Sequence, residues 1–168
     1  EGTFNMTDYI VNALTGADLG AYFVTLIVSM IPVIELRGAI PLGVGLGLSH
    51  FDAMWVSMVG NMLPVPFIIL FIRPIFKWMT RKSEKLGRLV TKLEARAEGK
   101  WDQVHKYQFF GLAVFVGIPL PGTGAWTGAL IAAVMDMRLR TALPSIALGV
   151  VIAGLLVTGI TYGFTSIF

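Results

Sequence analysis

Glu35 and Arg37 are the residues of this chain whose types and spacing best suit chemistry. Both lie in an apolar segment, residues 31–41, that prolines and a glycine interrupt. In a chain that is 55% hydrophobic and 14% charged, we expect this segment at membrane depth, where an ionisable group costs at least about 2.5–3.5 kcal/mol and usually marks a functional site. A guanidinium binds two oxygens of a phosphate or carboxylate at once, and a glutamic acid can take up and release a proton. We therefore expect Glu35 and Arg37 to contact a substrate or to carry a proton; the alternative is an internal ion pair that fixes the local backbone.

A second broken apolar segment, residues 118–128, occupies the matching place in the other half of the chain. Its glycines and prolines precede a returning apolar stretch, so the N–H groups and positive dipole end of a helix would point towards the middle of the membrane. Residues 38–41 would begin the corresponding helix of the first segment, with Pro41 in its first turn. Two helix N-termini and Arg37 together would form a pocket for an anion, whereas the alternative is that the glycines permit close helix packing. The residues expected at the two tips are Pro32, Gly38, Pro41, Pro119, Pro121, Gly122, Gly124 and Gly128.

Four further polar or aromatic side chains are candidates for the same site. Thr123 and Thr127 add hydroxyl donors, and Trp126 could pack on the apolar tail of a substrate. Asn61 lies within an apolar span and could hydrogen-bond to a tip; equally, it could satisfy backbone groups that Pro64 leaves free. The expected set for substrate binding or proton coupling is Glu35, Arg37, Asn61, Thr123, Trp126 and Thr127.

The lengths of the apolar segments predict an all-α integral membrane protein. Residues 20–34 would form a helix of about 22 Å, too short for a hydrocarbon core of roughly 30 Å, so we expect them to return through residues 41–48 as a re-entrant hairpin. Residues 53–72 are long enough to cross, with a kink at the prolines. The same order recurs in the second half, and interrupted short segments at matching positions of two repeats are typical of transporter sites near the bilayer midplane. We expect one membrane domain, 1–168, with repeat one at 20–72, a linker helix at 73–106 and repeat two at 107–165.

The positive charge of the chain is concentrated in one stretch. Ten of its 13 lysines and arginines lie between residues 73 and 106, where apolar residues recur every three or four positions. That pattern predicts an amphipathic helix on the cytoplasmic membrane surface, in contact with anionic lipid. Arg138 and Arg140 would lie on the same side, which gives the two repeats opposite orientations and places 12 of the 13 positive charges inside. Residues 4–16 predict a further short helix at the interface.

Several function classes find no support in the sequence. Nucleic-acid binding would need a basic face on a soluble fold. His50 and His105 stand alone without metal-ligand spacing, and the chain has no cysteine. No glycine-lysine phosphate loop, zinc-hydrolase motif or serine-nucleophile motif occurs. We therefore expect no cofactor, no metal and no nucleic-acid partner.

Three motifs point to a known family. They are Glu35-Leu36-Arg37-Gly38-Ala39-Ile40-Pro41-Leu42, Asn61-Met62-Leu63-Pro64 and Pro119-Leu120-Pro121-Gly122-Thr123-Gly124-Ala125-Trp126-Thr127-Gly128. Over roughly residues 20–160 the chain resembles the prokaryotic putative small multidrug export proteins, which implies export across the inner membrane. Its hairpin and span architecture also resembles the wider DedA group, whose members are implicated in moving lipids, including polyprenyl phosphates. In that group we expect the acidic and arginine residues to be divided between the hairpins, whereas here Glu35 and Arg37 share one.

The sequence therefore predicts a multi-pass transporter of the prokaryotic inner membrane, not an enzyme. Its expected substrate is amphiphilic and anionic, a lipid phosphate or a drug-like molecule, and Glu35 would couple transport to protons. Because hairpin tips cannot face lipid with unsatisfied backbone groups, we expect a homodimer or larger assembly. Two alternatives remain: an intramembrane lipid-phosphate enzyme with Glu35 as acid or base, which lacks an accompanying nucleophile or metal set, and a membrane scaffold that uses the basic amphipathic helix.

Overall fold

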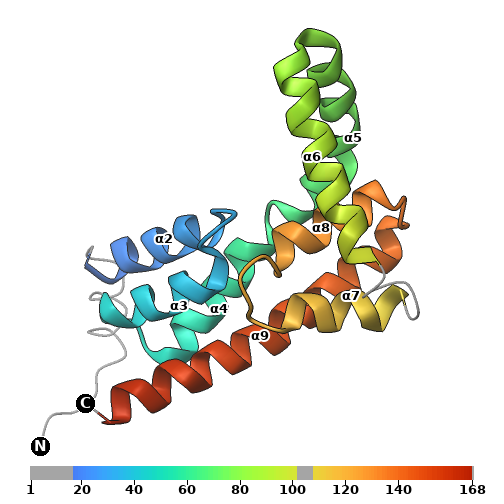
Figure 1. Cartoon of the computed structure of the whole chain (residues 1–168). Coiled ribbons are helices and arrows are strands. Elements are labelled where there is room, and N and C mark those ends of the chain that lie inside the picture. Colours follow the sequence, from blue (N-terminus) through green and yellow to red (C-terminus); the bar gives the residue numbers. More distant parts are fainter. Residues whose placement is uncertain (1–16, 102–107, 168) are drawn as a thin grey trace, which may run out of the picture.

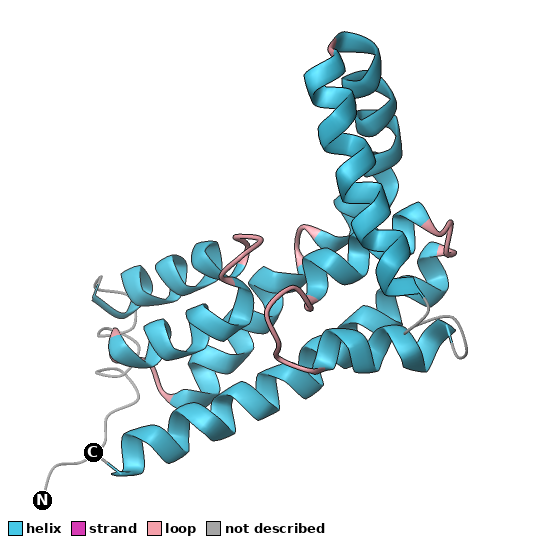
Figure 2. Cartoon of the chain, viewed as in Figure 1, coloured by secondary structure: helices cyan, strands magenta, loops and turns pink. Residues whose placement is uncertain are grey.

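The computed structural model describes residues 17–101 and 108–167, and every regular element in these ranges is an α-helix (Figures 1 and 2). This confirms the predicted all-α class. The interfacial helix predicted at 4–16 and the predicted end of the linker, 102–106, lie outside the described residues. The helices are α2 (Ala17–Ser29), α3 (Glu35–Gly45), α4 (His50–Met62), α5 (Val65–Lys82), α6 (Glu84–Trp101), α7 (Gln108–Gly117), α8 (Ala125–Val134) and α9 (Leu139–Ile167).

Helix α9 links the two halves of the chain. Helices α2, α3 and α4 pack on one another, and both α3 and α4 contact α9. Helix α7 lies along another part of α9, while α8 packs between α5, α6 and α9. In Figure 1, α9 extends from the region of α7 to the far end of the α2–α4 group. One buried cluster therefore contains residues of both halves, among them Leu36 of α3, Leu112 of α7 and Ile146 of α9.

Glycine permits close helix contacts at several of these crossings. A Cβ atom on Gly60 of α4 would lie 2.5 Å from the Leu26 carbonyl oxygen of α2, and one on Gly149 of α9 would lie 2.6 Å from the Ala113 carbonyl oxygen of α7. Gly128, which we expected at a tip, lies inside α8, where a Cβ would be 2.5 Å from a valine of α7. For these positions the close-packing explanation of the glycines holds.

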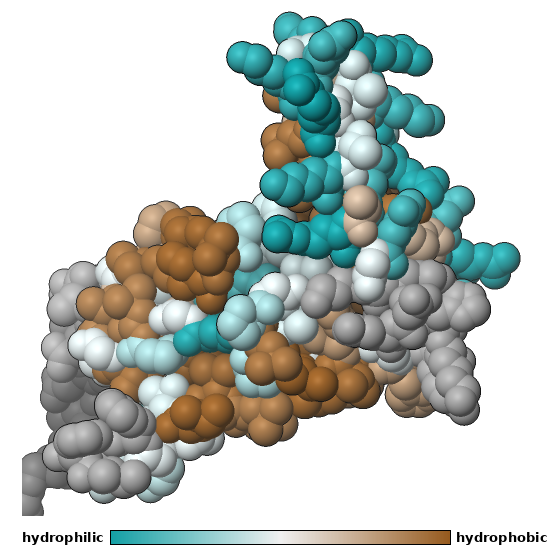
Figure 3. All heavy atoms as spheres, viewed as in Figure 1, coloured by the Kyte–Doolittle hydropathy of each residue, from teal (hydrophilic) through white to brown (hydrophobic). Residues whose placement is uncertain are grey.

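Two helical stretches are long and apolar enough to cross a bilayer, His50–Lys82 and Leu139–Gly163. Large apolar side chains lie exposed on them, including Phe67 at 64% and Leu155 at 59%. Figure 3 shows hydrophobic residues over much of the bundle and hydrophilic ones over α5 and α6 where these helices project from it. Such extensive exposed apolar surface is characteristic of a protein embedded in lipid.

The first of these stretches is interrupted at Leu63 and Pro64, between α4 and α5. The interruption lies where the sequence predicts a kink, and both residues keep a right-handed helical backbone, so His50–Lys82 remains one stretch. Pro64 and Pro66 have no N–H, so neither can donate the helical hydrogen bond to the carbonyl four residues earlier. The chain resumes as α5 with Pro66 in its first turn, a position where a missing N–H costs little.

The prediction of a single amphipathic linker helix over 73–106 is wrong. Residues 73–82 form the second half of α5, and α6 folds back against it, so that the pair projects from the bundle as a helical hairpin (Figure 1). Ser83 has an extended backbone that separates the two helices. The apolar positions expected to face lipid are partly used within the protein, because Val90 and Ala97 of α6 are buried.

The expected helix start at residues 38–41 is also wrong, because α3 already begins at Glu35. Pro41 consequently lies in the helix interior, where its missing N–H leaves the Arg37 carbonyl without a helical partner. Glu35 has a φ of +50°, in the left-handed region. The Glu35 N–H donates to the Ile31 carbonyl at 2.9 Å, outside α3. This bond turns the chain into the helix.

Candidate functional site

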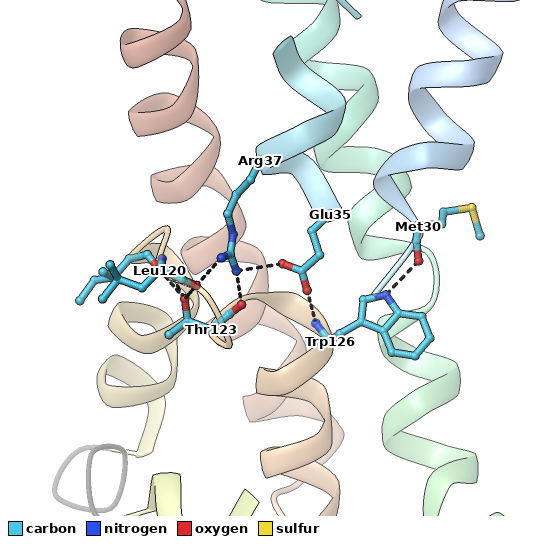
Figure 4. Close-up of polar contacts among 7 residues, drawn as sticks. Met30, Glu35, Arg37, Leu120, Thr123 and Trp126 are labelled. Atoms are coloured by element: carbon cyan, nitrogen blue, oxygen red, sulfur yellow. Dashed lines mark hydrogen bonds and ion pairs between the residues drawn. The ribbon is translucent and has the colours of Figure 1, made fainter. Parts of the chain in front are cut away.

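Two loops from opposite halves of the chain meet at the starts of α3 and α8 (Figure 4). The first loop, residues 30–34, connects α2 to α3, and the second loop, residues 118–124, connects α7 to α8. Glu35 and Arg37 follow the first loop directly. The contacts described below join these side chains to the second loop and to the first turn of α8.

Glu35 caps the N-terminus of α8 from another helix. Its side chain is buried, with the residue 2% exposed, and its Oε1 atom accepts a hydrogen bond from the Trp126 N–H at 3.1 Å. Gly124, the N-cap residue of α8, has no side chain to supply this bond. A carboxylate at this position also interacts favourably with the positive end of the helix dipole. The left-handed backbone of Glu35, which costs of order 1–3 kcal/mol for a residue other than glycine, places a carboxylate on the terminus of a helix far away in sequence.

Arg37 holds the second loop through its carbonyl groups. Its Nη1 donates to the Leu120 carbonyl and its Nη2 donates to the Thr123 carbonyl. The same Nη2 lies 3.5 Å from Glu35 Oε2, and the Arg37 side chain remains 23% exposed. Among the described residues, Arg37 is the one charged side chain within ion-pair distance of Glu35. The ion pair is therefore part of a larger contact in which a single guanidinium joins a carboxylate to two loop carbonyls.

Thr123 and Trp126 make contacts between and within the loops. The Thr123 hydroxyl lies 2.6 Å from the Ile118 carbonyl oxygen, to which it can donate, and accepts from the Leu120 N–H at 3.2 Å. The indole Nε1–H of Trp126 donates to the Met30 carbonyl at the end of α2, at 2.9 Å. The hydroxyl thus stabilises the fold of its own loop, and Trp126 connects α8 to the first loop.

Gly124 is the residue that permits Glu35 to reach α8. Its φ of +122° is unfavourable for any residue with a side chain, and a Cβ there would lie 1.9 Å from Glu35 Oε2. Gly122 also has a positive φ, +83°, but a Cβ there would meet no atom within 4 Å. Two glycines of one loop therefore differ: both allow the backbone conformation, and only Gly124 also makes room for the carboxylate.

The remaining predicted site residues lie outside this set of contacts. Thr127 is half-buried in α8. Asn61 of α4 is 1% exposed, and its Oδ1 atom has no hydrogen-bond partner in the described part of the chain. Gly60, its neighbour, packs against Leu26 and Ser29 near the end of α2, so Asn61 lies close to the level of the first loop. A buried side-chain oxygen without a hydrogen-bond partner is uncommon.

A cavity of about 360 Å³ adjoins the second loop on the side of α7. Leu120 and Thr123, whose carbonyls bind Arg37, also line this cavity. The other walls are apolar, from Phe110, Gly111, Val114, Phe115 and Ile118. No sequence pattern predicts this cavity, because most of its walls are ordinary apolar residues of α7 and of the second loop.

Sequence comparison adds one finding. The model of the family described as "Putative small multi-drug export protein" matches residues 35–156, nearly three quarters of the chain. The chain belongs to this family. The match begins at Glu35 and contains Arg37, the whole second loop and Trp126. It agrees with the resemblance read from the sequence motifs, and the family's description indicates export rather than catalysis. No curated protein and no solved structure gives a significant match to the chain.

Proposed function

We propose that this chain transports an amphiphilic, anionic molecule, a lipid phosphate or a drug-like compound, across the inner membrane of a prokaryote. The family description and the two apolar stretches of spanning length support transport as the general function. The observation that carries the more specific proposal is the position of Glu35. Its carboxylate lies between the N-terminus of α8 and Arg37, the surroundings that would suit the head group of an anionic substrate.

Proton uptake at Glu35 would open this site to a substrate. The ionised carboxylate only accepts hydrogen bonds, and it holds the Trp126 N–H and Arg37. A protonated carboxyl group loses its charge, so a phosphate or carboxylate could replace it on the same donors. The protonated group then needs an acceptor, and we propose that this is the buried Asn61 Oδ1, which has no hydrogen-bond partner in the described part of the chain. Proton binding and anion binding would therefore favour each other, which is the basis of coupled transport.

The apolar tail of the substrate would lie in the 360 Å³ cavity beside the second loop. Leu120 and Thr123 contribute carbonyls to Arg37 and also line the cavity. A head group that replaced these carbonyls on Arg37 would release the loop. The loop's prolines and glycines allow a few hinge positions to absorb such a movement.

Helix lengths support a re-entrant arrangement of both short helix pairs. Helices α2 and α3 have 13 and 11 residues and α7 and α8 have 10 each, so none exceeds about 20 Å against a core of roughly 30 Å. We propose that each pair enters and leaves on one side and that the two pairs have opposite orientations, with their loops meeting near the midplane. A second copy of the chain would cover the apolar faces of the short helices, giving a homodimer.

Opposite orientations predict that position 50 and position 138 are accessible from different sides of the membrane. Single cysteines at these positions, in a chain that otherwise has none, can be labelled with a membrane-impermeant maleimide in right-side-out and inverted vesicles. We expect position 138 to be labelled from the cytoplasmic side, together with a control cysteine at position 88. Labelling of positions 50 and 138 from the same side would contradict the inverted arrangement.

Proteoliposomes test the transport proposal directly. The purified chain would be reconstituted and assayed with a phospholipid panel, a polyprenyl phosphate and cationic drugs, with and without a pH gradient. We expect movement of an anionic amphiphile that the gradient stimulates. Chemical conversion of the substrate would favour the intramembrane enzyme, and no movement of any compound would favour the scaffold.

A further inference from the structure

A second cavity, of about 590 Å³, lies at the base of the α5–α6 hairpin beside the end of α8. The α5 wall contributes Arg73, Lys77 and Arg81, which recur every fourth residue. The α6 wall contributes Glu94 and Glu98, also four residues apart. One wall of the cavity is therefore cationic and the opposite wall is anionic. The uncharged lining residues are Phe76, Thr80, Val90, Thr91 and Val134.

The two walls do not neutralise each other. No nitrogen of Lys77 or Arg81 lies within 4.0 Å of a carboxylate oxygen in the described part of the chain, and Arg73 pairs with Asp136 at 3.0 Å instead. Arg73 also donates to the Val134 carbonyl at 2.8 Å, which fixes the base of the hairpin to α8. Opposite charges thus face each other across an open space that a ligand with both signs of charge could fill.

The cavity lies at the polar end of the apolar bundle. Arg138, directly before α9, and Arg140, in its first turn, are exposed and follow Val134 and Asp136 closely in the chain. Trp78 of α5 is 58% exposed, and the Lys82 ammonium lies 5.2 Å from the centre of its ring. Exposed tryptophan next to lysine is typical of the lipid head-group region. The cavity is therefore expected at the depth where phospholipid head groups lie.

We propose that this cavity binds the head group of a zwitterionic phospholipid whose amine is a primary ammonium. The phosphate would contact Lys77 and Arg81, and the ammonium would donate hydrogen bonds to Glu94 and Glu98. A choline head group has no N–H to donate, and a glycerol head group has no positive charge for the α6 wall. This site is separate from the one formed by Glu35 and Arg37, and the proposal does not depend on transport.

Binding of short-chain phospholipids to the full-length chain in a neutral detergent tests this, with native mass spectrometry as the readout. The ligands are the dihexanoyl forms of phosphatidylethanolamine, phosphatidylcholine and phosphatidylglycerol. We expect phosphatidylethanolamine to bind about fivefold more tightly than the other two, because exposed charge pairs contribute modestly. The double variant Glu94→Gln/Glu98→Gln should remove this preference without weakening the binding of phosphatidylglycerol. The double variant Lys77→Gln/Arg81→Gln should weaken the binding of both phosphatidylethanolamine and phosphatidylglycerol.

Controls remove charges of the same sign from exposed positions outside the cavity, one carboxylate on the acidic side and two cations on the basic side. These are Glu84→Gln for the acidic residues and Lys85→Gln/Arg88→Gln for the basic ones. We expect lipid binding by these variants within about twofold of the parent. Equal effects of control and cavity variants would overturn the proposal, as would phosphatidylglycerol binding more tightly than phosphatidylethanolamine, or no saturable binding of any of the three lipids.

Discussion

Glu35→Gln is expected to abolish transport, with at least a 100-fold loss of about 2.7 kcal/mol, while the protein still folds and inserts. The glutamine amide oxygen can replace the carboxylate as acceptor for the Trp126 N–H, so the start of α8 remains capped. The amide carries no negative charge and takes up no proton, so the anion site would stay accessible and release would fail. Transport in proteoliposomes, with yield and oligomeric state of the purified variant, measures both parts of this expectation.

Glu84→Gln is the matched control, because it removes one carboxylate from the exposed start of α6. It should transport normally. If Glu35→Gln instead failed to insert or lost its oligomeric state, the purely structural ion pair would be the better explanation. Transport at the parent rate would exclude Glu35 from the mechanism.

Arg37→Ala separates further the two roles of the Glu35–Arg37 pair, in transport and in stabilising the fold. It leaves the Leu120 and Thr123 carbonyls and a buried carboxylate without their donor, each unsatisfied group costing about 1–3 kcal/mol. We expect lost transport with a lowered melting temperature, and the double variant with Glu35→Gln should recover part of the stability but none of the transport. Recovery of transport by exchanging the two residues would contradict distinct roles and support a simple pair.

Gly124→Ala is expected to destabilise the protein by more than about 4 kcal/mol or to prevent its folding. The added Cβ would lie 1.9 Å from Glu35 Oε2 and would have to adopt a φ of +122°. The carboxylate would be displaced from the N-terminus of α8, leaving it buried without its partners. Melting of the purified variant in detergent, followed by circular dichroism, measures the loss.

Gly122→Ala is the control for backbone strain alone. Its φ is also positive, +83°, but the added Cβ would contact no atom within 4 Å. We expect a loss of about 1–2 kcal/mol. Equal effects of the two alanines would mean that the fit of Glu35 against the second loop contributes nothing beyond backbone conformation.

Local patterns predicted the residues of the site better than their partners. Glu35 and Arg37 were identifiable because charged residues in an apolar segment are costly, and the second loop was identifiable from its prolines and glycines. The atoms that they bind are the carbonyls of Leu120 and Thr123 and the N–H of Trp126. Every residue except proline carries both groups, so no sequence pattern distinguishes the ones that will be contacted.

Two predictions that the structure contradicts, the start of α3 and the lipid contact of α6, fail for a related reason. Proline favours a first helical turn, which predicts a helix start at residues 38–41, whereas α3 starts at Glu35, in a left-handed conformation, and has Pro41 in its interior. The spacing of the apolar stripe of α6 is that of an amphipathic helix and predicts that the stripe faces lipid. The same stripe can pack on protein: α6 contacts α5 and α8, and its Val90 and Ala97 are buried. Periodicity identifies the apolar face but not what covers it.

The most direct test of the central claim is the pH dependence of amphiphile binding to the purified chain. Suitable probes are a phosphodiester amphiphile, whose charge is constant between pH 5 and 8, and a quaternary-amine amphiphile of equal chain length. If Glu35 must take up one proton before an anion binds, the dissociation constant of the phosphodiester should fall by up to about tenfold per pH unit as the pH is lowered. Glu35→Gln should bind it tightly at every pH. Tighter binding of the quaternary amine that increases with pH would contradict the account and make Glu35 the counter-charge for a cationic drug.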